Sequence, residues 1–268
     1  MIPSRQENAV LHLLTLFFSV LALVMFVPPV AQSQHYHDFA DAQTMFGIAN
    51  FLNVASNLAI LVAGVLGLGF MCRSDVRDIG GPRQTFSTAA EWWPYFVCFI
   101  GVILTAFGSA YYHYNPNNET LIWDRLPMTI MFMGLFCAVI AERISPRAGL
   151  QLTVPLLLLG AGAVVNWAMT EKLGLGDLRL YAIIQFFPML ALPVILYLFP
   201  PRYTCSNGLF VSMGWYVLAK ILEGTDGFFY HLIGVSGHTI KHLLCGVSSY
   251  WLYKMLKERV AVPAAVSE

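Results

Sequence analysis

Long stretches without a charged residue dominate the chain and determine its predicted architecture. Seven of them lack Asp, Glu, Lys and Arg altogether: 8–37, 42–72, 92–118, 126–141, 148–170, 180–201 and 203–219. Their apolar residues run continuously instead of alternating, which favours membrane-spanning helices of about 20 residues over the strands of a barrel. A helix also satisfies its own backbone hydrogen bonds, as a membrane span must. The pattern predicts helices at about 9–30, 50–71, 93–112, 125–141, 151–169, 180–199, 208–223 and 236–256.

The first of these segments has two interpretations. Arg5 followed by apolar residues 9–27 is typical of a signal peptide, and 31–33 (AQS) forms a small-x-small cleavage site. The apolar stretch is longer than the roughly 7–15 residues usual in signal peptides, so an uncleaved transmembrane helix is equally expected. Either way, the predicted fold is an all-α membrane protein. It is a seven-transmembrane-helix bundle with an extra N-terminal hydrophobic helix or signal peptide. The expected divisions are the N-terminal segment 1–33, the membrane domain 34–260 and a short C-terminal tail 261–268.

Composition agrees with a membrane protein and excludes other classes. Of the 268 residues, 57% are hydrophobic and 11% are charged, whereas about 25% are charged in soluble domains. The 15 Lys and Arg residues are balanced by 15 Asp and Glu residues. No excess of positive charge is present to neutralise phosphates, which excludes a nucleic-acid partner. We therefore expect the lipid bilayer as a partner of this chain.

The distribution of Lys and Arg predicts how the chain crosses the membrane. Basic residues follow the first, third, fifth and seventh core helices: Arg73, Arg77, Arg83, Arg143, Arg147, Arg202, Lys254, Lys257 and Arg259. The opposite connections 31–49, 112–123 and 224–235 contain no Lys or Arg. Because cytoplasmic loops carry the excess of basic residues, we expect a multi-pass protein with a cytoplasmic C-terminus and a non-cytoplasmic 112–123 loop.

Three histidines occupy positions at which an imidazole is costly. His238 and His242 are four residues apart at the start of the last helix, so they share one helical face. His113 ends the second core helix, and Ser109 lies one turn before it on the same face. Asp124 opens the third core helix on the same predicted side of the membrane. Polar groups gathered at one depth of a membrane protein indicate a functional site.

Three imidazoles with a carboxylate and a hydroxyl group are typical of a catalytic zinc site. Zinc binds neutral imidazole nitrogens, and three protein ligands leave one position open for water. Bound zinc lowers the pKa of that water towards about 7. Asp124 can then act as a general base, and Ser109 can hold the developing oxyanion. The alternative for the two histidines of the last helix is hydrogen bonding between helices.

Four short motifs resemble those of the alkaline ceramidases, which belong to the CREST superfamily of seven-helix membrane hydrolases. Residues 108–113 (GSAYYH) and 123–128 (WDRLPM) resemble the S-x3-H and D-x-x-P-M motifs of that family, with a matching gap between them. Residues 237–242 (GHTIKH) resemble its terminal H-x3-H motif, and residues 53–58 (NVASNL) resemble the N-x-x-S-N-L motif of its first helix.

The resemblance implies a metal centre and an activity. Zinc would be held by His113, His238 and His242, with Ser109 and Asp124 as the catalytic residues around it. The implied enzyme is an intramembrane zinc-dependent amidohydrolase. It would cleave the N-acyl amide of ceramide-like sphingolipids to a free fatty acid and a sphingoid base, at a site that faces the non-cytoplasmic side. A lipid receptor or sensor of the same fold, an ester-cleaving lipid hydrolase and an ion transporter with a histidine relay remain as alternatives.

The chain departs from the family at the acidic N-terminal segment that binds calcium there. The corresponding residues 35–41 contain only Asp38 and Asp41 as carboxylates, and Asn50 stands where the family has a glutamate. Because calcium prefers several hard oxygen ligands, we expect a solvated loop here in preference to a calcium site.

Several further polar and aromatic residues have two interpretations or a simple structural role. Asn50, Asn53 and Ser56 are expected either to bond between helices or to support the site. A local charge cluster or a gate for the substrate is expected at the end of the sixth core helix, from Lys220, Glu223 and Asp226. Trp92 is expected in the interfacial aromatic belt and His231 in a loop.

Overall fold

The computed structural model describes residues 5–79 and 83–262, and it is built from helices. No β-strand forms among these residues, which confirms the all-α class for the described part of the chain. Most of the expected tail 261–268 falls outside the described residues, and so does the side chain of Arg5.

Five helical segments are long and apolar enough to cross a membrane, judged by length and composition. They are Phe51–Met71, formed by α2 (Phe51–Ala55) and α3 (Asn57–Met71), and α5 (Ala89–Tyr114), α6 (Asn118–Arg143), α7 (Pro146–Lys172) and α8 (Arg179–Leu198). The other long helices are α1 (Arg5–Phe26), α9 (Asn207–Gly224) and α11 (Gly237–Glu258), and the short ones are η1 (Gln34–His37), α4 (Ser74–Arg77) and α10 (Asp226–Ile233). Several such segments indicate a membrane protein, and the count of seven spans stays a prediction.

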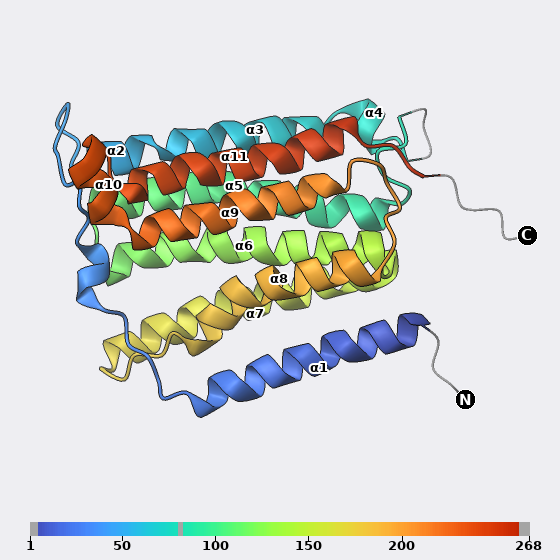
Figure 1. Ribbon diagram of the computed structural model, residues 1–268, viewed down its shortest axis with the longest axis horizontal. Helices are drawn as coiled ribbons and strands as arrows, with labels where there is room; N and C mark the ends of the chain where they lie inside the picture. Colours follow the sequence, from blue (N-terminus) through green and yellow to red (C-terminus); the bar gives the residue numbers. More distant parts are fainter. Residues whose placement is uncertain (1–4, 80–82, 263–268) are drawn as a thin grey trace, which may run out of the picture.

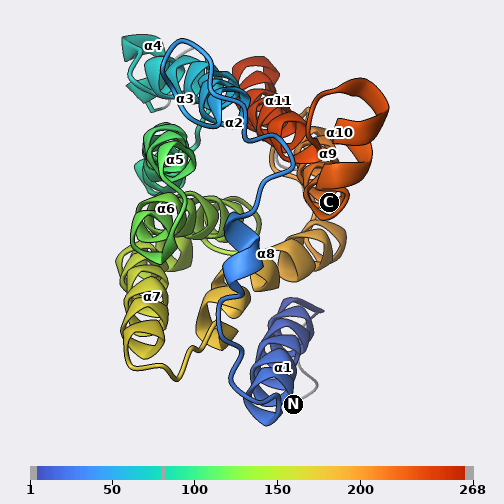
Figure 2. The same cartoon turned by 90° about the vertical axis from the view of Figure 1, so that its left-hand side faces the viewer.

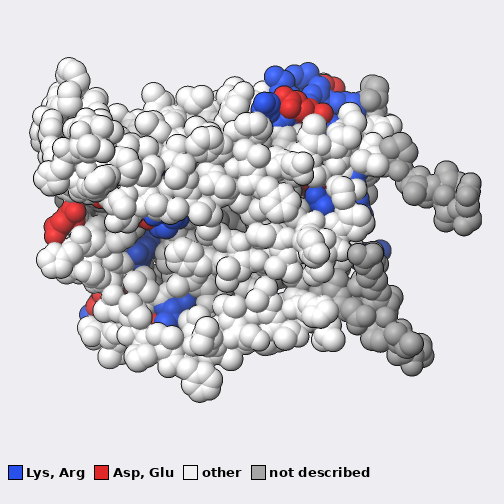
Figure 3. All heavy atoms as spheres, in the orientation of Figure 1, with Lys and Arg blue, Asp and Glu red and all other residues white. Residues whose placement is uncertain are grey.

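The long helices run roughly side by side along the long axis of the molecule (Figure 1). Seen from one end, they form an open ring in which α3 and α11 lie together, α5, α6 and α7 follow along one side, and α8 and α9 close the other (Figure 2). The most extensive packing joins α5 to α6 and α11 to α9, and α1 packs on α8. Most of the surface seen in Figure 3 is uncharged, and charged side chains gather towards the two ends of the bundle.

A close helix–helix contact fixes the place of the predicted catalytic residues. A Cβ atom added to Gly108 of α5 would collide with the backbone carbonyl oxygen of Trp123 in α6. Glycine permits this approach because it has no Cβ atom. The residues that follow in each helix, Ser109 and Asp124, are therefore held at the same interface, where both are buried.

A buried ionic network joins several elements at the end of the bundle where α11 finishes. Arg259 follows α11, and its Nη1 lies 2.5 Å from Oε2 of Glu142 in the last turn of α6. Tyr95 of α5 donates to the same oxygen at 3.0 Å. The guanidinium of Arg259 also lies over the rings of Phe86 and Tyr203. Arg259 and Glu142 are only 2% and 1% exposed, so this pair is screened from solvent.

Two predictions from the sequence were wrong. His231 was expected in a loop, but it lies in α10 (Asp226–Ile233), which ends at Gly234 in a left-handed conformation with φ of 74°. An eight-residue helix is too short to show a clear helical period in the sequence. Trp92 was expected at the membrane interface, but it is buried and its indole N–H donates to the carbonyl oxygen of Met71 at 3.1 Å.

Candidate metal centre

Three buried histidines from two helices form one group. His113 lies in the last turn of α5, and His238 and His242 lie in the first two turns of α11. One ring nitrogen from each lies within 4.8 Å of the others, and the Nε2 atoms of His113 and His238 are 3.2 Å apart. Among the residues that the structure describes, this is the one group of three or more His, Cys, Asp or Glu side chains placed to hold a metal ion. The structure thus brings the three predicted histidines together.

Asp226 fixes the start of α11 at this group. Its Oδ1 accepts a hydrogen bond from the backbone N–H of His238 at 2.8 Å, and its Oδ2 accepts one from the backbone N–H of Ala40 at 2.9 Å. The sequence suggested a cluster of Asp226 with Lys220 and Glu223. The carboxylate of Asp226 instead connects the chain before α2 to the first turn of α11.

Polar side chains at the start of the first core helix reach the histidines. Ser56 Oγ lies 2.8 Å from Nδ1 of His242, and Asn50 donates to the backbone carbonyl oxygen of His113 at 2.9 Å. These contacts fit both expected roles, because they bond between helical elements and reach two of the histidines. A partner on Nδ1 leaves Nε2 of His242 as the nitrogen that faces the group, which is the usual way in which a metal-binding histidine is oriented.

Unpaired nitrogen atoms make the group suitable for a metal ion. Nδ1 of His113 and Nε2 of His242 are buried, and neither has a hydrogen-bond partner within the described part of the chain. A buried polar atom without a partner is costly, and a metal ion held by the group would satisfy Nε2 of His242. Nζ of Lys241 lies 2.9 Å from Nε2 of His238, so this ammonium group must turn aside before that nitrogen binds a metal.

Ser109 and Asp124 lie next to the histidine group. The Ser109 side chain lies beside the Asp124 carboxyl group, and both residues line one cavity together with His242. All five residues predicted from the sequence as metal-ligating or catalytic are therefore brought into a single region. A carboxylate and a hydroxyl group beside an imidazole cluster can hold a water molecule and move its proton.

The cavity has a volume of about 300 Å³ and runs between α3, α5, α6, α8, α9 and α11. The polar and charged side chains that line it beside His242 include Ser109, Asp124, Lys220, Glu223 and Lys241, and further along it is lined by Gln185, Tyr216, Ser212, Ser248 and Ser249. Its apolar lining includes Val102, Phe132, Leu135, Leu192 and Leu252. Along α5 the lining residues extend from Ser109 to Cys98, a length of about 16 Å at about 1.5 Å per residue. A largely apolar cavity with charged groups beside the histidines suits an amphipathic molecule.

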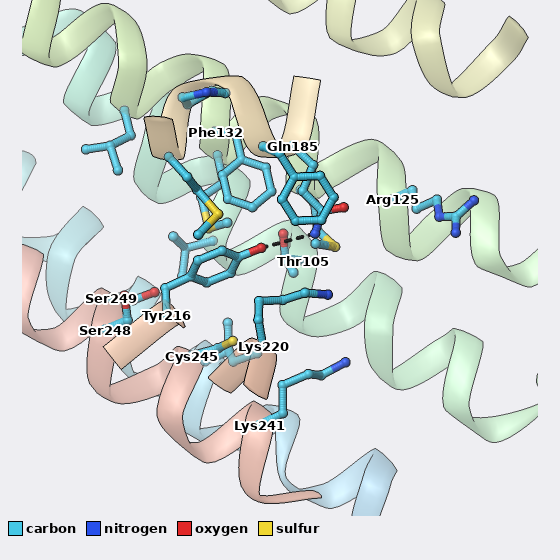
Figure 4. Close-up of a pocket in the computed structure, with 18 of the residues that line it drawn as sticks. Thr105, Arg125, Phe132, Gln185, Tyr216, Lys220, Lys241, Cys245, Ser248 and Ser249 are labelled. Carbon is cyan, nitrogen blue, oxygen red and sulfur yellow. Dashed lines mark hydrogen bonds between the residues drawn. The ribbon is translucent and has the colours of Figure 1, made fainter. Parts of the chain in front are cut away.

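Two lysines and a glutamate form an ionic cluster in the polar part of this cavity. Lys220 of α9 and Lys241 of α11 both pair with the carboxylate of Glu223, the second at 3.0 Å. Figure 4 shows the two lysine side chains extending in the same direction, towards the middle of the cavity. The motifs in the sequence do not reveal Lys241 as a site residue. Its spacing of three from His238 is the signal that places it on the same helical face.

Arg125 turns away from the two lysines (Figure 4). Its guanidinium lies 4.2 Å from the ring centroid of Trp167 in α7 and 4.7 Å from that of Tyr181 in α8. Its Nη2 donates to the side-chain oxygen of Gln32 at 2.5 Å. These contacts join α6 to α7, to α8 and to the segment that precedes η1.

The segment before α2 covers the histidine group. The ring of Phe39 lies 4.7 Å from the ring of His113 and 4.7 Å from the ring of His238, measured between centroids. His37 holds the same segment in place, because its two ring nitrogens lie 2.9 Å from the Tyr112 hydroxyl oxygen and 2.9 Å from Oδ1 of Asn118. The histidines are thus screened from the end of the bundle by an aromatic side chain.

The two carboxylates considered for calcium have different surroundings. Asp38 is exposed and contacts His35 at 3.0 Å. Asp41 is buried, and its Oδ1 accepts a hydrogen bond from the backbone N–H of Gln43 at 3.1 Å. Among the described residues, no group of three carboxylates forms around them.

No family of known proteins and no curated protein matches this chain. The likeness to alkaline ceramidases is therefore carried by the four sequence motifs, and the inference of function has to start from the geometry of the site.

Proposed function

We propose that this chain is an intramembrane zinc-dependent amidohydrolase that cleaves the N-acyl amide of ceramide-like lipids. The observation that carries the proposal is the meeting of three buried histidines with Ser109 and Asp124 at the charged part of a largely apolar cavity. The apolar lining suits acyl chains, and the charged part places acid–base groups where an amide linkage would lie. The resemblance to alkaline ceramidases points to the same reaction.

Zinc suits the three histidines better than a hard cation does. Neutral imidazoles are common zinc ligands, whereas calcium and magnesium prefer oxygen. His113, His238 and His242 would hold the ion, and the Nε2 atoms of His113 and His238 are 3.2 Å apart. When bound, zinc polarises a carbonyl group and lowers the pKa of water towards about 7.

The protein side chains would divide the proton transfers between them. Asp124 accepts the proton of the attacking water and returns it to the nitrogen of the leaving amine. Ser109 donates a hydrogen bond to the carbonyl oxygen as negative charge develops on it. The amide C–N bond breaks, the acyl carbon gains the hydroxyl group, and the products are a fatty acid and a sphingoid base.

The proposal includes a topology with seven spans. Residues of α9 and α11 would cross the membrane beside the five segments described above, with the C-terminus in the cytoplasm and the histidines towards the non-cytoplasmic face. The concentration of Lys and Arg after α3, α6, α8 and α11 supports this orientation. The segment 1–33 would be either an additional span or a cleaved signal peptide.

An Asp124→Asn variant tests the proposed chemistry. The amide keeps the size of the carboxylate but does not accept the proton, so release of fatty acid from an N-acyl sphingoid base should fall by about 10²–10⁴-fold. Zinc content, measured on the same purified samples, should stay near one per chain. Ser109→Ala should also keep the metal and lose about 10²-fold in turnover.

The controls separate this proposal from its alternatives. Wild-type protein that holds zinc and cleaves neither amide nor ester lipids would favour a receptor or sensor. Cleavage of acyl esters alone would favour an ester hydrolase. Normal turnover by Asp124→Asn would show that Asp124 is not the base.

A further inference from the structure

The part of the cavity beside His242 carries more positive than negative charge. Its charged side chains are those of Asp124, Arg125, Lys220, Glu223 and Lys241, which are three cations and two carboxylates. An uncompensated charge is costly within a membrane, and a divalent metal ion on the neutral histidines would add to the positive excess. A ligand that completes this cavity should therefore bring negative charge.

The two lysines have donors left for such a ligand. The ammonium groups of Lys220 and Lys241 share the one carboxylate of Glu223. Each ammonium has three N–H donors, so one shared carboxylate does not use them all. Their side chains are partly exposed to the cavity, 29% for Lys220 and 14% for Lys241. Arg125 also keeps a donor, because its buried Nη1 has no partner among the described residues, but its guanidinium is turned away from the lysines and towards Gln32 and two aromatic rings (Figure 4).

The lysines also stand in the right place relative to the proposed reaction. Lys241 lies between the two histidines of α11 and on their face, and Lys220 reaches the same space from α9 (Figure 4). Ser109 and Asp124 contribute from α5 and α6 across the cavity. A lipid with its acyl chain along the apolar lining and its amide at Ser109 and Asp124 would present the far end of its amine part to the lysines.

We infer that the lipid bound here carries an anionic oxygen group, a phosphate, sulfonate or carboxylate, on its amine part, held by Lys220 and Lys241. The inference rests on the proposed function, since it names the class of N-acyl amide lipid that is cleaved. A neutral ceramide fills the apolar cavity equally well but leaves the positive excess uncompensated. The preferred substrate is therefore the acidic member of any pair of lipids with the same chains.

Lipid binding to a variant that has low turnover and keeps all its charged side chains tests the inference without relying on catalysis. Ser109→Ala protein with its metal in place is titrated in detergent with ceramide 1-phosphate and with ceramide of the same chain length. Binding of the phosphorylated lipid should be at least about tenfold tighter, because each hydrogen bond to a charged group adds appreciably to affinity. Equal affinity for the two lipids would overturn the inference.

Matched lysine variants test whether these side chains cause the preference for the phosphorylated lipid. Lys220→Gln in the Ser109→Ala protein should reduce the preference for ceramide 1-phosphate by about tenfold, and Lys220→Arg should restore most of it. Lys172→Gln is the control, because this lysine is exposed and lies outside the cavity lining. A preference that survives in Lys220→Gln protein of normal thermal stability would overturn the assignment to the lysines.

One further measurement distinguishes a lipid headgroup from a free anion as the ligand. Another distinguishes failure of the charge inference from failure of the hydrolase proposal. Inorganic phosphate that displaces ceramide 1-phosphate at equal concentration would indicate a free-anion site and overturn the lipid assignment. Preferential binding of the phosphorylated lipid by wild-type protein that cleaves no lipid would support the charge inference while the hydrolase proposal fails. Turnover of ceramide with no preference for the phosphorylated lipid would support the hydrolase proposal and overturn the charge inference.

Discussion

At the scale of single residues, the histidines are held by neighbours that leave a nitrogen of His242 open towards the group. Ser56 lies at Nδ1 of His242, and the carboxylate of Asp226 holds the backbone N–H of His238. Such contacts restrict the imidazole rings before any metal binds. A pre-oriented ligand set loses less conformational entropy on binding, which favours a tight site.

Removing any one of the three imidazoles should release the metal. His113→Ala, His238→Ala and His242→Ala each leave two strong ligands, so most of the metal should be absent after purification. Elemental analysis of the purified protein measures this directly. His231→Ala is the control, because His231 lies in α10 and outside the group, and its metal content should match the wild type. Metal retained in His238→Ala but lost from His231→Ala would show that the group is misassigned.

At the scale of elements, α11 is anchored at both ends by different chemistry. Its first turn is held by Ser236, which accepts a hydrogen bond from the backbone N–H of Thr239 at 3.0 Å. Its last turn leads into Arg259, which is paired with Glu142 of α6. The helix that carries two of the histidines is thereby fixed in position along its axis.

Breaking the buried pair at the end of α11 should destabilise the fold strongly. Arg259→Met leaves the buried Glu142 carboxylate with Arg143 as its remaining cationic partner, and the loss of one partner of a buried ionic group typically costs up to about 3–5 kcal/mol. A large fall in the midpoint of thermal unfolding in detergent is expected. Arg73→Met is the matched control, because the Arg73–Asp75 pair is exposed and should contribute at most about 1 kcal/mol. Equal shifts for the two variants would contradict the stabilising role of the buried pair.

At the scale of the whole molecule, the bundle places its histidines and the basic connections that follow α3 and α11 at opposite ends. The α5–α6 connection lies at the histidine end, whereas the α3–α4 connection and the end of α11 lie at the other (Figure 1). If the basic end is cytoplasmic, the cavity receives its metal ion from the opposite side of the membrane.

Thiol labelling in intact cells tests this orientation. A cysteine introduced by Asn115→Cys, in the exposed turn between α5 and α6, should react with a membrane-impermeant reagent. The native Cys72 and Cys205 are exposed free thiols, and they should react only after the cells are opened. Labelling of Cys72 and Cys205 in intact cells, with protection of the introduced cysteine, would reverse the orientation.

Much of the helical framework could be predicted from the sequence, because charge-free runs and helical spacing are local signals. The predicted helix at 93–112 is observed as Ala89–Tyr114, and that at 236–256 as Gly237–Glu258. The shared face of His238 and His242 follows from their spacing of four residues. The predicted topology places His113 at the same depth of the membrane, so its proximity to them was also expected.

The remaining features depend on contacts between distant residues. Arg259 and Glu142 are 117 positions apart, and no periodic pattern connects them. The pairing of Lys241 with Glu223 depends on how α9 packs on α11, because Glu223 comes from the other helix. The burial of Trp92 likewise depends on its contact with Met71 in α3.

The division of the histidines between α5 and α11 has a consequence for biosynthesis. The two histidines whose Nε2 atoms lie 3.2 Å apart are 125 positions apart in the chain. At a synthesis rate of about 5–20 residues per second, His113 waits about 6–25 seconds before His238 leaves the ribosome. A nascent chain therefore has a single imidazole at this place and no chelating group until its last long helix has inserted beside α3 and α9. Acquisition of the metal would then mark completed assembly, and a chain stalled before α11 would hold neither the ion nor the activity.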